Sequence, residues 1–155
     1  MIHVVLFEPE IPQNTGNIAR TCAITGSKLH LIKPLGFSLD DKYLKRAGLD
    51  YWDMLEKEVH ESFEDFLEKY GVESLFFLTT KSNSIYSEIE YPQECFLVFG
   101  KETAGLPQII HEKFKDQRFK IPMVDNPKAR SLNLSNSVNI VLYEALRQNS
   151  FPNMV

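Results

Sequence analysis

The sequence predicts an α/β fold in which helices flank a mostly parallel sheet, because strand-like apolar runs alternate along the chain with helical patterns. The apolar runs are residues 2–7, 29–32, 74–79 and 95–99. In these runs apolar residues occupy both alternating positions, as expected for strands that helices cover on both faces. A half-exposed antiparallel sheet is therefore not expected.

The last helical pattern in the chain is the clearest. From Leu134 onward, apolar residues recur at i, i+4, i+7, i+8 and i+11, which places them on one face of a helix. Ser131, Asn133 and Ser135 offer capping side chains near its start. The predicted helices are residues 16–25, 41–47, 51–55, 63–70, 107–113 and 134–148.

Length and composition are those of one globular domain. The chain has 155 residues, and a chain of roughly 150 residues buries about 70% of its unfolded surface. Hydrophobic residues make up 43% and charged residues 25%, which argues against disorder and against a fibrous repeat. We therefore expect a single domain that spans residues 1–155.

The sequence favours a protein of the reducing cytoplasm. Its first apolar run ends at Glu8 and lacks the basic start and the cleavage site of a signal peptide. No stretch approaches the roughly 20 apolar residues of a membrane span. Cys22 and Cys95 lie far apart among apolar neighbours, so we expect buried free thiols.

The formal net charge of −4 argues against a protein that coats nucleic acid nonspecifically, because phosphate binding depends on clustered lysines and arginines. A local basic patch remains compatible with this charge. The densest clusters are Lys42, Lys45 and Arg46, and Lys128 with Arg130. For each cluster, solvated surface charge is an equally good interpretation.

Three polar segments that contain glycine or proline are candidates for one site. The first segment is residues 8–20, the second is residues 100–107 and the third is residues 121–133. In an open parallel sheet, the loops that leave the carboxyl ends of the strands converge on the ligand crevice. We therefore expect these segments to meet.

Each segment alone also has a plain structural interpretation. Arg20 shares a helix face with Asn17 and can point into a cleft, although a lone arginine of this kind is more often a surface residue. Gly100 allows a ligand to approach the backbone, or simply forms a turn. Glu102 binds a ligand amine or caps the following helix, and Asn133 is part of a site or a helix cap.

Several well-known sites have no signature in the sequence. The glycine-rich dinucleotide and phosphate loops, the C-x-x-C motif and the H-E-x-x-H motif are all absent. The four histidines His3, His30, His60 and His111 are scattered, so each is expected to be structural or solvent-facing rather than a metal ligand. No metal cofactor is expected.

Taken together, the segments resemble a known family. Residues 14–20 (NTGNIAR), 99–107 (FGKETAGLP) and 121–136 resemble, in order and spacing, the three motifs of the SPOUT methyltransferases. The similarity covers nearly the whole chain. It is greatest to the small single-domain group that methylates the ribose 2′-hydroxyl of the tRNA wobble nucleotide, a cytidine or a modified uridine. Residues 8–12 (EPEIP) and 46–51 (RAGLDY) add to it.

The resemblance implies a fold whose C-terminal part forms a trefoil knot, although knots are very rare among folds. It implies that S-adenosylmethionine binds in the knot as methyl donor and leaves as S-adenosylhomocysteine. The residues implied to line the donor pocket are Leu78, Thr79, Gly100, Glu102, Gly105, Ile121, Met123, Ser131 and Leu132.

The resemblance also implies the catalytic residues and the partners. Arg20 is the residue that activates the hydroxyl. Because a guanidinium with a pKa above about 12 is a poor base, we expect it to donate hydrogen bonds to the developing alkoxide. Asn14, Asn17, Ser131 and Asn133 orient the ribose, the phosphate or the loop. The implied partners are the tRNA anticodon stem-loop and a second copy of the chain, with Arg20 of one subunit facing the donor pocket of the other.

Two alternatives of other classes remain. One is a noncatalytic RNA-binding or S-adenosylmethionine-sensing module, against which Arg20, Asn17 and Asn133 together argue. The other is a flavodoxin-like nucleotide-binding domain, which the lack of a phosphate-binding loop disfavours.

Overall fold

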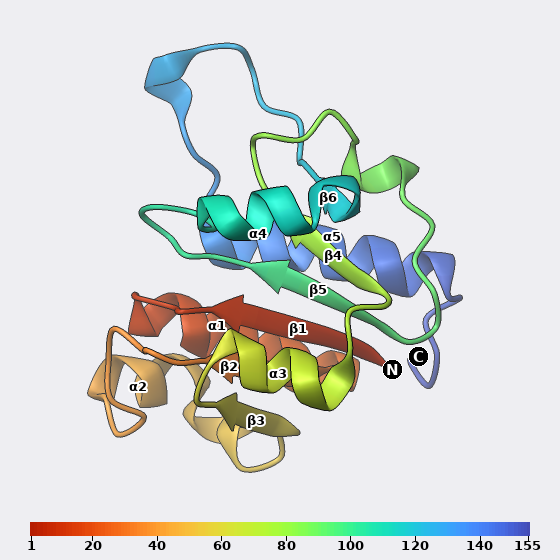
Figure 1. Ribbon diagram of the computed structural model, residues 1–155. Helices are drawn as coiled ribbons and strands as arrows, with labels where there is room; N and C mark the ends of the chain where they lie inside the picture. The colour runs from red at the N-terminus through yellow and green to blue at the C-terminus, as the bar shows by residue number, and fades with distance from the viewer.

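The structure is a computed structural model that describes the backbone of residues 1–155 and all side chains except those of residues 48–50. Within this part of the chain, six strands form one sheet in the order β3-β2-β1-β5-β4-β6, and all of its strand pairs are parallel (Figure 1). The strands are β1 (Ile2–Phe7), β2 (Lys28–Ile32), β3 (Lys57–His60), β4 (Leu75–Leu78), β5 (Cys95–Phe99) and β6 (Arg118–Phe119).

Helices cover both faces of this sheet. They are α1 (Pro12–Thr25), α2 (Lys42–Trp52), α3 (Phe63–Tyr70), α4 (Gln108–Lys113) and α5 (Leu134–Gln148). Figure 1 shows α3 and α4 on the near face of the sheet and α5 on the far face. The predicted α/β class, with a mostly parallel sheet flanked by helices, is confirmed.

The strand residues divide between two hydrophobic cores. In β1, Val4 and Leu6 pack into the core beneath α1 and α5, whereas Val5 and Phe7 pack into the core beneath α3 and α4. All of β1 and β5 is buried. This arrangement explains why both alternating positions of these strands are apolar.

Two helices begin or extend differently from the prediction. Helix α1 begins at Pro12 rather than at residue 16, because a proline fits the first helical turn, where its missing N–H group costs no hydrogen bond. Helix α2 is continuous, whereas the sequence predicts two helices over residues 41–47 and 51–55. The side chains of residues 48–50, which belong to the RAGLDY segment, lie outside the described part.

Strands β3 and β6 are the elements that the sequence analysis missed. Both lie at the edges of the sheet. In β3 three of the four residues are at least partly exposed and three are polar, and β6 has only two residues, so neither shows an apolar run. Their pairing is set by the neighbouring strands rather than by their own pattern.

Other expectations from composition can be compared directly with the structure. Cys22 and Cys95 are buried and unpaired, as predicted. Among the described residues, no helix combines the length and the hydrophobicity needed to cross a membrane.

The central strand β5 is expected to carry much of the stability. Leu97 is fully buried between neighbours of the first core. Leu97→Ala should lower the free energy of unfolding by about 2–5 kcal/mol, because it leaves a cavity in a packed core. Urea denaturation measures this change. Val72→Ala, at a side chain that is 46% exposed, is the control, and a Leu97→Ala effect as small as the control would contradict the packing described here.

Candidate functional site

A cavity of about 500 Å³ opens at the carboxyl ends of β4, β5 and β6. It is lined by residues that follow each of these strands and by the starts of α1 and α5. The carboxyl end of a parallel sheet is where such folds bind their ligands. The cavity is therefore the candidate functional site.

All three polar segments reach this cavity. The residues of the implied donor pocket that line it are Leu78, Thr79, Gly100, Glu102, Gly105, Ile121, Met123, Ser131 and Leu132. The predicted convergence of the segments is thus confirmed. Contact of these residues with a methyl donor stays a prediction.

Gly100, the first residue of the second segment, makes a close backbone contact with Phe7, the residue that precedes the first segment. Its φ angle is +108°, and a Cβ atom at this position would lie only 2.7 Å from the backbone oxygen of Phe7. Any side chain would push the end of β5 away from the end of β1. From the sequence, Gly100 either allows a ligand to approach the backbone or forms a turn. In the structure it allows the close approach of the Phe7 backbone, and contact with a ligand stays a prediction.

Glu102 fixes the same junction with hydrogen bonds. Its two carboxylate oxygens accept from the backbone N–H groups of Glu10 and Ile11, at 2.9 and 3.1 Å. In return, the Thr103 hydroxyl donates to the Glu10 carboxylate at 2.8 Å. The interpretation of Glu102 as a cap of α4 is wrong, because Pro107 is the N-cap residue and Glu102 bonds to the first segment instead.

Asn133 joins the third segment to the first. Its Oδ1 atom caps α5 by accepting from the N–H groups of Ser135 and Asn136, and its Nδ2 atom donates to Oδ1 of Asn14 at 3.0 Å. Asn14 is buried near the start of α1. The helix-cap interpretation of Asn133 is confirmed, and the same side chain also belongs to the cavity wall.

Arg20 and Asn17 lie elsewhere on α1. Both are exposed, and neither belongs to the lining of the cavity in its own chain, unlike Asn14 and Asn133. The Arg20 guanidinium lies 4.9 Å from the centre of the Tyr51 ring. The structure therefore brings two of the predicted catalytic residues to the cavity and leaves the other two on an outer helix face.

Positive charge surrounds the cavity. Lys81, Lys101, Lys120 and Arg130 line it, and the sequence analysis did not single out the three lysines for the site. Their positions carry a signal in retrospect, because Lys101 and Lys120 lie within two residues of a strand end and Lys81 lies two residues after Thr79. The lining suits a ligand with anionic groups.

His111 is a further lining residue that the sequence analysis missed. It is buried, and its Nδ1 atom lies 3.3 Å from a guanidinium nitrogen of Arg118. Burial, with Lys81 and Arg118 nearby, lowers the pKa of His111 below its ordinary value. The neutral form of the imidazole is therefore favoured, and its Nδ1 atom accepts from the Arg118 guanidinium.

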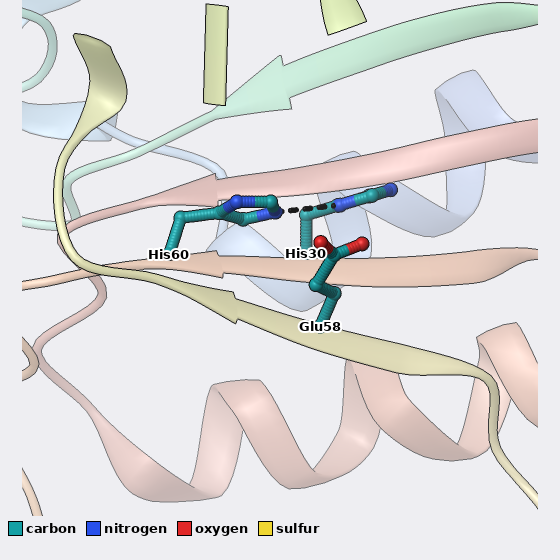
Figure 2. A group of neighbouring side chains, drawn as sticks. All are labelled: His30, Glu58 and His60. Atoms are coloured by element: carbon teal, nitrogen blue, oxygen red, sulfur yellow. Dashed lines mark hydrogen bonds between the residues drawn. The ribbon is translucent and has the colours of Figure 1, made fainter. Parts of the chain in front are cut away.

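The other three histidines form a cluster on the sheet beneath α3. The Nδ1 atom of His3 lies 2.9 Å from Nε2 of His30. The Nδ1 atom of His30 lies 3.0 Å from Nε2 of His60 (Figure 2). These residues come from the adjacent strands β1, β2 and β3. They are scattered in the sequence but adjacent in space, and all are buried.

Glu58 lies beside this cluster, and the ligand atoms of His30, Glu58 and His60 are within 4.8 Å of one another (Figure 2). Glu58 accepts hydrogen bonds from Tyr70, at 2.5 Å, and from Lys28 and Lys69. Burial alone would raise the pKa of Glu58, but these donors outweigh it and hold the pKa well below its usual range. Because the carboxylate and the facing nitrogens already have partners, the group is a structural network.

Acid is expected to destabilise the fold through the histidine cluster. Burial lowers the pKa of His30 from 6.5 to about 3, so below pH 6.5 the unfolded chain binds more protons than the folded one. The stability that His30 contributes is full above pH 6.5 and is lost progressively as the pH falls toward 3. His30→Gln should make the free energy of unfolding fall less steeply, by up to about 1.4 kcal/mol per pH unit. Urea denaturation from pH 7 to pH 5 measures the slope, and equal slopes would contradict this role of His30.

Comparisons with known proteins agree with the geometry of the site. The sequence model of the SpoU rRNA Methylase family matches residues 1–143. A relative from Escherichia coli K12, named tRNA (cytidine(34)-2'-O)-methyltransferase, is 49% identical in an alignment that covers 100% of this chain and 98% of the relative.

Two solved structures have the same fold. One, described as structural insights into the 2-OH methylation of C/U34 on tRNA, has 44% identity, covers 97% of each chain and gives a TM-score of 0.90. The other is the SpoU methyltransferase AviRb from Streptomyces viridochromogenes in complex with the cofactor AdoMet, with 25% identity and a TM-score of 0.81. It covers 96% of this chain and 60% of that chain.

Proposed function

Because the chain belongs to the SpoU rRNA methylase family, we propose that it transfers a methyl group from S-adenosylmethionine to the ribose 2′-hydroxyl of the tRNA wobble nucleotide, a cytidine or a modified uridine. The observation that carries this proposal is the meeting of all the motif loops at one cavity. The names of the Escherichia coli relative and of the C/U34 structure support the acceptor.

The cavity fits the methyl donor. Its volume of about 500 Å³ is within the roughly 300–1,000 Å³ of small-molecule sites. Apolar residues such as Leu78, Ile121 and Leu132 line it together with the glycine-containing second segment. This combination suits a ligand with an aromatic base and polar edges. When bound, S-adenosylmethionine supplies an electrophilic methyl group; no metal takes part.

The chain's own residues then align and stabilise the acceptor. The ribose oxygen must lie in line with the methyl carbon, so positioning contributes much of the rate. Arg20 donates hydrogen bonds to the ribose oxygen as negative charge develops on it. The hydroxyl proton is released to solvent water, because a guanidinium is a poor base. Asn14 and Asn133 hold the wall of the cavity, and Asn17 orients the ribose or the phosphate beside Arg20.

The active form is a homodimer in which Arg20 of one subunit faces the donor cavity of the other. The position of Arg20 outside its own cavity supports this arrangement. Ile24, Ile140 and Tyr143 are exposed by 56%, 36% and 40%, on helices α1 and α5 that pack together. A two-fold axis would bury these apolar side chains against the same surface of a second copy.

Residues 1–155 form one SPOUT domain, and its C-terminal part forms a trefoil knot around the donor. The anticodon stem-loop of a cytoplasmic tRNA binds at the cavity mouth, where lysines and Arg130 supply positive charge for its phosphates.

Nucleoside mapping tests the proposed reaction. The protein is incubated with radiolabelled S-adenosylmethionine and unmodified tRNA, and the labelled nucleoside is identified after digestion. Label on the ribose of the wobble nucleotide is expected. Label on a base would refute the acceptor, and absence of label despite donor binding would favour the noncatalytic sensing module.

Replacement of Arg20 tests its role in the reaction. Arg20→Ala should lower kcat by about 10²–10³-fold, the usual effect of losing a donor to a developing oxyanion. Donor affinity, measured by calorimetry, should stay unchanged because Arg20 stabilises the acceptor oxygen rather than the donor. Undiminished turnover would remove Arg20 from the mechanism.

A further inference from the structure

We infer that Tyr51 is a positioning residue whose ring holds the Arg20 guanidinium in its reactive orientation. This inference rests on the proposed function, because it concerns the residue that stabilises the acceptor oxygen. It gives a role to a residue of the RAGLDY segment that the proposed reaction otherwise leaves unused.

The packing of α1 against α2 determines where Tyr51 lies. A Cβ atom on Gly16 would lie 2.5 Å from Cβ of Ala47 and 2.9 Å from the backbone oxygen of Leu44. Only glycine allows the two helices to approach this closely. Leu44, whose backbone oxygen lies at this contact, has a buried side chain that anchors α2.

One helical turn further on, the same two helices bring Arg20 and Tyr51 together. Arg20 follows Gly16 by four residues and Tyr51 follows Ala47 by four residues, and residues four apart share a helix face. The Arg20 Cζ atom lies 4.9 Å from the centre of the Tyr51 ring. This distance is within the roughly 6 Å of a cation–π contact.

An aromatic neighbour suits an arginine that must donate to substrate. A carboxylate partner would occupy the N–H groups and neutralise the charge. An aromatic ring attracts the cation through its π face and leaves the N–H edges available. Because Arg20 is exposed, it would otherwise sample many rotamers, whereas a catalytic donor must be held within about 0.5 Å of its working position.

The chemistry of this contact requires the ring and not the hydroxyl of Tyr51. Tyr51→Phe should therefore retain near-normal turnover. Tyr51→Leu should lower kcat roughly 2- to 30-fold, the range that cation–π energies allow, with donor affinity unchanged. Tyr51→Gln, which also lacks a ring, provides the same comparison if the leucine variant does not fold.

The decisive measurement is a double-mutant cycle with Arg20→Ala. In the Arg20→Ala background, Tyr51→Leu should cause no further loss of kcat, because without the Arg20 guanidinium the Tyr51 ring has no group to position. A general disturbance of α2 would lower activity in both backgrounds. The control is Lys57→Ala, which removes a cation–π contact of 5.0 Å with Trp52 at the same end of α2 and should leave kcat within about twofold.

Three outcomes would overturn the inference: equal losses from Tyr51→Leu in both backgrounds, a Tyr51→Phe variant as slow as Tyr51→Leu, or normal kcat in Tyr51→Leu. Each is measured against a wild-type protein that labels the tRNA ribose. A wild-type protein that labels no ribose contradicts the proposed function itself, so the two failures are distinguishable.

Discussion

The close approach of Gly100 to the backbone of Phe7 is the contact on which the site depends. It sets the ends of β1 and β5 side by side, so that the loops after these strands start from adjacent points. Glu102 and Thr103 can then exchange hydrogen bonds with residues 10 and 11. The pair of Asn14 and Asn133 adds the start of α5 to the same wall.

The carboxyl end of the sheet and the face beneath α3 serve different purposes. The cavity lies at one end of the strands, where loops leave backbone groups and charged side chains accessible. The histidine cluster lies on the face beneath α3, where the Glu58 carboxylate and the ring nitrogens that face one another have partners within the protein. The residue types of this cluster are those of a metal site. Its hydrogen bonds to other groups of the protein distinguish it from a ligand site.

Much of this architecture could be predicted from the sequence. Strands β1 and β5 and helices α3 and α5 have the predicted bounds, because their burial or amphipathic pattern is strong. Strand β3 could not be predicted, because the polar residues of an edge strand carry no periodic signal. The contact between Arg20 and Tyr51 could not be predicted either, since it depends on how closely α1 and α2 pack. The histidine cluster likewise depends on strand order.

The hydrogen bond between Asn133 and Asn14 links residues that are separated by most of the chain. During synthesis on the ribosome, α1 is complete long before Asn133, the partner of Asn14, emerges. The cavity therefore forms only when the residues that lead into α5 have been synthesised. Until then, residues 14–20 of the nascent chain lack their partners from the third segment.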